Sequence, residues 1–431
     1  FFGGDISPAL LAVGFIVRLN IAVLIFIGGF LGWLIGIPLL GNGLEYATDP
    51  LHGASTLWST KIRYVGVGAM VIGGLSSIIK VRKGLSDAIR ILIDTQKGTN
   101  QDKIPHNQRD MPARAINIFS FLAITLVGFV YYHITGNVGI TIVTTIIMVI
   151  MAFFFTAVAS YIVGLVGNSN SPVSGMTITA VLFTGGLLYI FGFSGTEGMV
   201  ATLGVAAIVC CAACTSGDVC NDLKTGQIVG SKPYRQQIMQ IIGVAVASII
   251  MAPILQLLHE NTPGGIGGRE LAAPQAGLFA SLAEGFFGDG HLPLDMVSIG
   301  AVLGIIILIT DSFLFDTGKS GEFRLHLMPI AVGMYLPFGL STPILVGGLL
   351  AHFILKRDNS KKEPDSILQN GVLLSSGLIA GESLMGILLA FVASAGIQKM
   401  NLGLQPDLVT VLTILSSLAT VWWLYNSSRS E

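Results

Sequence analysis

Long apolar runs recur from one end of this 431-residue chain to the other, and they limit its fold more than any other feature. Several runs reach at least about 18 residues, the length at which an α-helix can cross the hydrocarbon core of a bilayer. Charged residues make up 11% of the chain, against about 25% in a typical soluble domain. We therefore expect an all-α, polytopic integral membrane protein of the plasma or inner membrane.

One dense polar stretch interrupts two of these runs. Residues 167–177 read GNSNSPVSGMT and separate the apolar residues 139–166 from the apolar residues 178–193. Backbone that leaves the helix inside a membrane survives only where it is buried in protein or lines a wet cavity. Free helix N-termini favour a carboxylate, although the same side chains could merely cap and cross-link helices. We interpret the stretch as a binding place for a polar solute, formed by Asn168, Ser169, Asn170, Ser171, Pro172, Ser174 and Gly175.

Basic residues predict which loops face the cytoplasm. The most basic loop covers residues 80–114, and shorter basic segments occur at 216–237 and 356–362. The positive-inside rule assigns all three to the cytoplasm. Residues 260–291 carry four carboxylates against one arginine and are assigned to the outside. The number of membrane crossings does not agree with the sides assigned to the loops around residues 295–324. One apolar segment there is therefore expected to be re-entrant rather than membrane-spanning.

A segment near the start of the chain recurs near its end. Ala12-Val13-Gly14 reappears as Ala331-Val332-Gly333, and Gly28-Gly29 reappears as Gly347-Gly348, both at an offset of 319. A weaker echo follows at an offset of 307, in which Ile72, Gly74 and Ser76 match Ile379, Gly381 and Ser383. Self-similarity at a fixed spacing is the mark of an internal repeat.

Charges at the helix ends indicate that the two copies face opposite ways. The first Gly-Gly helix leads into a loop without Lys or Arg, whereas the second ends at Lys356 and Arg357. This is the inverted-repeat plan of secondary transporters. We expect residues 1–112 to hold the C-terminal part of the first repeat with a cytoplasmic linker, and residues 113–431 to hold the second repeat. Ala331 follows the start of the second repeat at Ala113 by 218 positions, whereas only 11 residues precede its counterpart Ala12. Roughly 200 residues of the first repeat are therefore expected upstream.

Three carboxylates are candidates for proton coupling. Glu382 lies near the centre of the apolar run 368–394, where an ionisable group is by default a functional-site hypothesis. The alternative is a neutral carboxyl group that is hydrogen-bonded to a neighbouring helix. Asp218 and Asp222 lie in the polar stretch at the cytoplasmic end of a span, where they could relay protons or could simply be paired in a solvated loop.

Helix breaks supply the other substrate-binding candidates. Tyr335 and Pro337 mark an interruption of the second Gly-Gly unit, and a tyrosine there could contact a substrate or simply sit at the membrane interface. Ser7, followed by Pro8, is a good helix start. We expect discontinuous helices at Ser7–Asn20, Asn168–Gly175 and Tyr335–Pro343 to converge on a cavity at mid-membrane.

Several chemistries find no support in the residues. Cys211 and Cys214 have the spacing of a metal pair, but no further ligand lies near them in sequence, so no metal site or cofactor is expected. The four cysteines do not form a disulfide framework. A phosphate-binding loop of the GxxxxGK[ST] kind is absent, which argues against ATP-driven pumping. With no catalytic constellation either, we do not expect an enzyme.

Four motifs occur in order along the chain, namely GNSNSPVSGMT at 167–177, GDVCNDLKTG at 217–226, AVGMYLP at 331–337 and GLIAGESL at 377–384. ISPALLAVG at 6–14 fits with them. This combination resembles the oligopeptide transporter family, which includes the yellow-stripe-like metal-chelate carriers. The resemblance implies proton-driven import of small peptides, or of metal bound to peptide-like chelators.

The prediction is therefore a secondary active transporter that imports small oligopeptides together with protons. Import of metal–chelate complexes is the nearest alternative, and a channel whose re-entrant segments form a filter is an alternative of another class. The expected partners are the small-molecule substrate, protons and the lipid bilayer, with no nucleic acid. The sequence leaves open whether the protein forms a homodimer.

Overall fold

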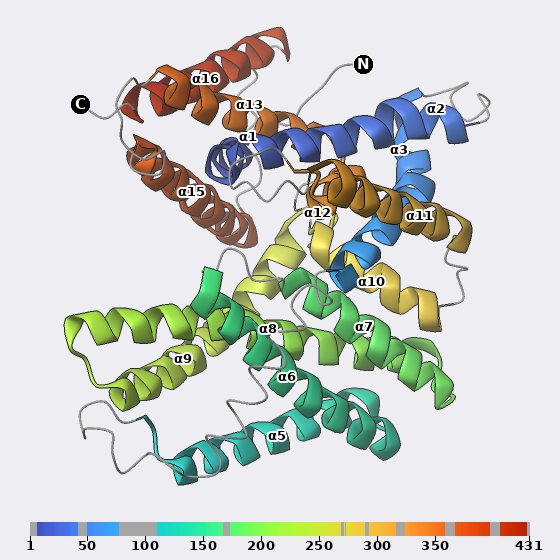
Figure 1. Ribbon diagram of the computed structural model, residues 1–431, viewed down its shortest axis with the longest axis vertical. Helices are drawn as coiled ribbons and strands as arrows, with labels where there is room; N and C mark the ends of the chain where they lie inside the picture. The colour runs from blue at the N-terminus through green and yellow to red at the C-terminus, as the bar shows by residue number, and fades with distance from the viewer. Residues whose placement is uncertain are drawn as a thin grey trace. The chain divides into compact units, whose positions relative to one another are not determined.

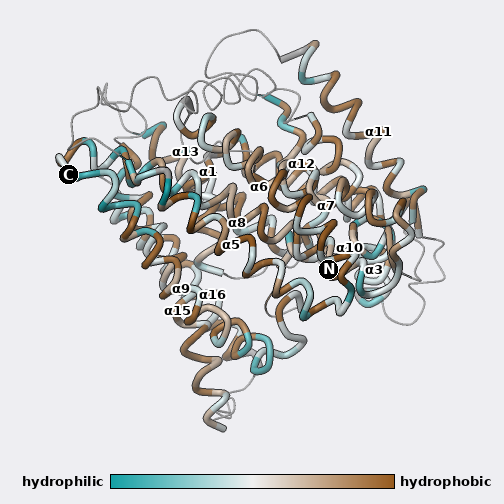
Figure 2. Tube along the Cα trace, turned by 90° about the horizontal axis from the view of Figure 1, so that it is seen from below, coloured by the Kyte–Doolittle hydropathy of each residue, from teal (hydrophilic) through white to brown (hydrophobic). Residues whose placement is uncertain are grey.

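The computed structural model describes residues 7–41, 50–76, 110–166, 173–268, 271, 273–288, 293–315, 324–357, 367–396 and 406–428. Every regular element within these ranges is a helix, and none of the described residues lies in a strand. Ten of the described helices are long and apolar enough to cross a membrane, and Figure 2 shows apolar residues along most of the helical chain. The chain is an all-α, multi-pass integral membrane protein, as the apolar runs predict.

The helices follow one another along the chain as labelled in Figure 1. They are α1 (Pro8–Phe30), the π-helix η1 (Leu31–Gly36), α2 (Ile37–Leu40), α3 (Pro50–Leu57), the π-helix η3 (Trp58–Ile62), helical residues 63–76, α5 (Ala113–Thr135), α6 (Val138–Val166), α7 (Val173–Ile190), α8 (Gly195–Val229), α9 (Pro233–Asn261), α10 (Pro274–Phe287), α11 (Leu294–Thr310), the π-helix η7 (Asp311–Phe315), α12 (Leu327–Tyr335), α13 (Phe338–Arg357), α15 (Gln369–Ser394) and α16 (Pro406–Ser427).

These helices form two compact units. Unit 1 contains the described residues up to Ile72, residues 254–274 and the described residues from Pro293 onward. Unit 2 contains the described residues between Gly73 and Pro253 and between Gln275 and Leu292. Each unit has its own buried apolar clusters.

In unit 1, α1 packs closely along α12 and α13 (Figure 1). A Cβ atom at Gly14 would lie 2.0 Å from the carbonyl oxygen of Ile344, and one at Gly333 would lie 2.0 Å from that of Ile25. At the repeat offset of 319, Gly333 is the counterpart of Gly14 and Ile344 is the counterpart of Ile25. The two contacts are therefore the same contact, made once from each copy of the repeat.

A second pair of contacts obeys the same relation. A Cβ atom at Gly28 would lie 2.0 Å from the carbonyl oxygen of Ile330, and one at Gly347 would lie 2.0 Å from that of Leu11. These residues are again counterparts at an offset of 319. As the residue number in α1 rises, the number of its contact residue in α12 and α13 falls. Helix α1 therefore runs antiparallel to α12 and α13. Reciprocal antiparallel packing of this kind is what two inverted copies of one segment produce.

The second copy is broken at the predicted place. Helix α12 ends at Tyr335, and Leu336 has extended backbone with φ −74° and ψ 147°. Pro337 causes this conformation, because its ring excludes the preceding residue from the helical region and it offers no N–H. At nine residues, or about 13 Å of helix, α12 is too short to cross a bilayer. It lies after residues 295–324, where a re-entrant piece was expected. The described helix in that range, Leu294–Phe313, is long and apolar enough to cross a membrane, so that expectation stays a prediction.

The other interruption expected in this copy, at Ser341-Thr342-Pro343, is wrong. Helix α13 runs through Pro343 without a break. A proline inside a helix leaves the carbonyl four residues earlier without its donor, and here that carbonyl belongs to Gly339. The Thr342 hydroxyl donates to the Gly339 oxygen at 2.9 Å and so replaces the missing bond.

The break expected within Ser7–Asn20 is also absent, because α1 is continuous from Pro8 to Phe30. No proline follows Pro8 until Pro38, so nothing in between removes a backbone donor. In the described chain the irregularities of this copy lie at the two ends of α1. Ser7 is its N-cap, and the π-helix η1 follows its last residue.

In unit 2, α6, α7 and α8 pack together around a cluster that includes Tyr131, Met148 and Val205 (Figure 1). Helix α8 is 35 residues long and continues to Val229, so the polar loop expected from residue 216 onward is wrong over most of its length. Its polar residues are compatible with helix. The helix ends only where Gly230 adopts the left-handed conformation, with φ 78°.

Candidate functional site

Glu382 on α15 binds the start of α1. Its Oε1 accepts a hydrogen bond from the Ser7 hydroxyl at 2.8 Å, and its Oε2 accepts one from the Ala9 backbone N–H at 2.7 Å. The Ser7 oxygen also accepts from the Leu10 N–H at 3.1 Å, which makes Ser7 the N-cap of α1. Two candidates that lie 375 residues apart in sequence are thus in direct contact.

The chemistry of this contact depends on the charge of the carboxylate. The first turn of a helix has free N–H groups and a partial positive charge, both of which favour an anion. An ionised Glu382 can accept both bonds, whereas a protonated carboxyl group presents a donor in place of one acceptor. A proton on Glu382 therefore weakens the link between α15 and the start of α1.

Tyr335 lies at the break between α12 and α13 and is 3% exposed. Arg63, at the start of helical residues 63–76, donates from Nη2 to the Tyr335 hydroxyl. The Arg63 Cζ also lies 4.7 Å from the centre of the Tyr335 ring. Gly66 permits this approach, because a Cβ there would lie 2.9 Å from the Tyr335 backbone nitrogen. Pro337, the other candidate at this break, follows two residues after Tyr335.

Two π-helices lie next to this pair. Trp33 belongs to η1 and Trp58 begins η3, and their rings stack with centroids 5.7 Å apart. A Cβ at Gly32 would lie 3.0 Å from the Ile62 side chain and 3.6 Å from the Met334 Cα. Hence η1 lies against both η3 and the last turn of α12. Irregular turns of this kind are frequent at functional sites.

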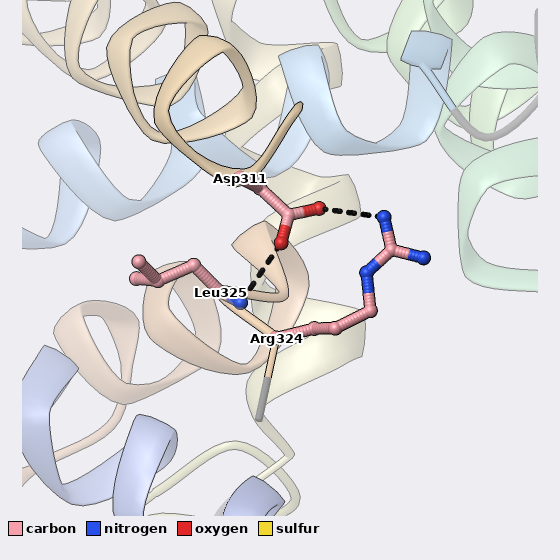
Figure 3. A network of polar contacts seen from close by, with 3 residues as sticks. All are labelled: Asp311, Arg324 and Leu325. Atoms are coloured by element: carbon pink, nitrogen blue, oxygen red, sulfur yellow. Dashed lines mark hydrogen bonds and ion pairs between the residues drawn. The ribbon is translucent and has the colours of Figure 1, made fainter. Parts of the chain in front are cut away.

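An ion pair between a buried aspartate and a partly exposed arginine lies ahead of α12 in the chain (Figure 3). Asp311, the first residue of η7, is 5% exposed and accepts from the Leu325 backbone N–H at 2.9 Å. Its other oxygen lies 3.4 Å from Nη2 of Arg324. The two contacts tie the end of α11 to the residues that lead into α12.

The remaining proton-coupling candidates lie in unit 2, on α8. Asp222 accepts from the Gln240 side chain of α9 at 2.5 Å, and its backbone oxygen accepts from the Gln236 side chain at 2.9 Å. Asp218 is exposed and lies one turn earlier on the same helix. The contacts of Asp222 connect α8 to α9.

The polar stretch is described only in part. Asn168, Ser169, Asn170, Ser171 and Pro172 lie outside the described residues. Ser174 and Gly175 lie in the first turn of α7, and Gly175 is buried. A Cβ at Gly175 would lie 3.1 Å from the Gly74 Cα, so this glycine serves close helix packing.

No group of three or more His, Cys, Asp or Glu side chains that could hold a metal ion occurs within the part of the chain that the structure describes. The four cysteines of α8 are free thiols.

Comparison with protein families gives a match over residues 1–393 to the family described as OPT oligopeptide transporter protein. The chain belongs to the OPT family. It is therefore a member of a transporter family, as the four sequence motifs predict.

Named relatives of this OPT chain fall into two groups. A protein of Haemophilus influenzae named "Putative oligopeptide transporter" is 30% identical over 422 residues, which cover 91% of this chain and 66% of that protein. A probable metal-nicotianamine transporter of Arabidopsis thaliana is 24% identical over 426 residues, covering 91% of this chain and 57% of that protein. One of Oryza sativa is 22% identical over 403 residues, covering 88% and 54%. The chain thus spans between about half and two thirds of the length of these relatives.

Sequence reasoning missed several residues of this OPT chain that the structure brings forward. Arg63, Asp311, Trp33 and Trp58 were not among the candidates that the sequence offered. One signal was available, because the segment from Trp58 to Tyr64 combines aromatic rings with two cations next to an apolar run. Only the fold places these side chains beside the α12 break.

Proposed function

We propose that the protein is a secondary active transporter that imports small oligopeptides together with protons. The observation that carries this proposal is the contact of Glu382 with Ser7 and the Ala9 N–H at the start of α1. It couples a titratable carboxylate to a helix end in the repeat that forms the core of unit 1. Membership of the OPT family supports the transport class.

The proposed mechanism uses the two charge states of Glu382. When it is ionised, it holds α15 against the start of α1. When a proton arrives, the carboxyl group loses one acceptor, and α1 is released from α15. Release lets one helix bundle move against the other, so that access alternates between the two sides of the membrane. The proposed substrate contacts in unit 1 are Tyr335 and Pro337, at the break between α12 and α13. A substrate contact of residues 168–175 stays a separate prediction.

Import of a metal chelate is the second candidate, favoured by the relatives named as metal-nicotianamine transporters. The same proton step serves either cargo. Competition between a free tripeptide and a metal–nicotianamine complex for uptake separates the two. Asp218 and Asp222 stay predictions for the proton path, as does the assignment of residues 1–112 and 113–431 to two repeats.

Glu382→Gln tests the coupling step in proteoliposomes. Glutamine keeps the size of the side chain and cannot carry the proton, so uptake driven by a pH gradient should be abolished. Exchange of internal for external substrate should persist, because it needs no net proton movement. Glu197→Gln is the matched control, since Glu197 is an exposed carboxylate in the first turn of α8. Unchanged gradient-driven uptake by Glu382→Gln would remove Glu382 from the mechanism.

A further inference from the structure

Three buried N–H donors near the α12 break have no acceptor among the described residues. They are Nε of Arg63 and the indole nitrogens of Trp33 and Trp58. Buried donors are hydrogen-bonded in nearly all cases, and each exception requires an explanation. All three of these groups are donors, so a single ligand that offers acceptors could satisfy them.

Local backbone geometry brings the residues that carry these donors close together. The Arg63 N–H bonds to the Trp58 carbonyl oxygen across one π-turn. Five residues of an α-helix make about 1.4 turns, which would set the two side chains on different faces. The i→i+5 closure of η3 instead leaves them close to one full turn apart. The Trp33 ring stacks on the Trp58 ring with centroids 5.7 Å apart, so Trp33 lies beside them. We call these three residues the donor cluster.

The cluster is positively charged. Arg63 contacts the neutral Tyr335, and no described carboxylate pairs with it. Lys61, two residues earlier, donates to the Leu40 carbonyl oxygen at 3.3 Å and adds a second positive charge. An ionisable side chain packed among the helices of a membrane protein is by default a functional-site hypothesis, and Arg63 has no acidic partner in the described part of the chain. Its planar fork of donors matches a carboxylate in particular.

We propose that Arg63, Trp33 and Trp58 form a subsite for a carboxylate group of the transported solute. A carboxylate is an acceptor-only group, and so it complements a set made only of donors. The subsite rests on the proposed function, in which the solute lies at the break between α12 and α13. A peptide C-terminus and a carboxylate of a metal chelate both provide the required group.

Intrinsic fluorescence measures binding at this subsite directly. The chain has four tryptophans, and the other two, Trp422 and Trp423, are exposed on α16. In a Trp422→Phe, Trp423→Phe background, emission comes from Trp33 and Trp58 alone. Titration with trialanine should give a saturable change, whereas trialanine amide should bind at least about tenfold more weakly because it lacks the charge. Nickel–nicotianamine forms a third arm that reports whether a chelate is the source of the carboxylate.

Variants in the same background identify the donors. Arg63→Gln should weaken the binding of trialanine or of the chelate about tenfold or more and remove the preference for acid over amide. Arg63→Lys keeps the charge but loses the planar pair of N–H donors, so its affinity for the probe should lie between those of the parent and of Arg63→Gln. Trp58→Phe keeps the stacked ring and removes one N–H, so it should weaken binding several-fold. Arg235→Gln is the matched control, because Arg235 also lies over a tyrosine ring but is exposed.

Two outcomes would overturn the subsite. One is an equal response of the unsubstituted cluster to acid and amide, or no saturable response to either carboxylate probe. The other is unchanged trialanine or chelate binding by both Arg63→Gln and Trp58→Phe in protein that unfolds at the same temperature as its parent. The binding assay needs no pH gradient and no transport. A failure of proton-coupled uptake is therefore distinguishable from a failure of the subsite.

Discussion

Two carboxylates in unit 1 bind backbone N–H groups close to the beginning of corresponding helices. Glu382 accepts from Ala9 at the start of α1, and Asp311 accepts from Leu325 just before α12. Because α12 begins the second copy of the segment that α1 begins, each copy has an acidic anchor near its first turn. The anchors differ in setting, since Asp311 is buried and paired with Arg324 whereas Glu382 is exposed.

Asp311→Asn should destabilise the protein. Asparagine keeps the shape of the side chain but loses the charge that strengthens both bonds, and the expected cost is about 1–3 kcal/mol in the free energy of unfolding. Thermal unfolding of the purified protein in detergent measures this as a lower Tm.

Glu284→Gln is the control for that change, because Glu284 is exposed on α10 and should change stability by less than about 0.5 kcal/mol. Equal effects of the two substitutions would contradict an anchoring role for Asp311.

At this scale, the sequence predicts residues that stand out from apolar surroundings. The helix break at Tyr335 and Pro337 was predicted in this way and is confirmed. Glu382 was singled out in the same way, and its role in proton coupling stays a prediction. Arg63 was missed because hydropathy places it at the margin of a span. Its importance comes from the turn of η3 and from the packing of α12, and neither leaves a mark in local composition.

At the scale of helices, glycine decides how closely α1 approaches α12 and α13. Gly14→Ala and Gly333→Ala should each destabilise the protein by about 1–3 kcal/mol or more, since overpacking forces the helices apart. In both cases the new methyl group would lie 2.0 Å from a carbonyl oxygen. Because the contacts are reciprocal, the two costs should be similar. Thermal unfolding again provides the measurement.

Gly377→Ala is the matched control on α15, where a Cβ meets nothing within 4 Å. It should be neutral or stabilising by up to about 1 kcal/mol, because alanine is the better helix former. Tolerance of all three substitutions would mean that the close packing of α1 does not contribute to stability.

Helix existence was predicted well and helix continuity less so. The sequence indicated a break at Ser341–Pro343 and a loop beginning at residue 216, and both regions are helical. Proline and polar residues lower helix preference, but a single hydroxyl can replace a lost donor, as Thr342 does. Such local compensation depends on the geometry of one turn, and residue preferences do not contain it.

At the scale of the whole chain, the repeat predicts opposite orientations for α2 and the end of α13. Leu39 and Lys356 are both exposed near these ends. In a background without the four native cysteines, Lys356→Cys should react with a membrane-impermeant maleimide from the cytoplasmic side. Leu39→Cys should react from the outside, because α1 and α13 are antiparallel.

Inside-out and right-side-out vesicles separate the two cases. Labelling of both cysteines from the same side would contradict the inverted arrangement. The orientation of the copies could be predicted from loop charges, but their direct packing could not. Sequence similarity indicates that two segments are related, but it does not indicate whether they pack against each other.

The pairing of α1 with α12 and α13 also has a consequence for biogenesis. The partner of α1 is encoded about 319 residues downstream. At roughly 5–20 residues per second, a ribosome needs about 15–65 s to reach it. During that interval the side of α1 that carries Gly14 and Gly28 is in the membrane before α12 and α13 have been synthesised. The insertion machinery or lipid must cover it until then. Nascent chains halted before residue 330 would therefore be the species most exposed to quality-control proteolysis.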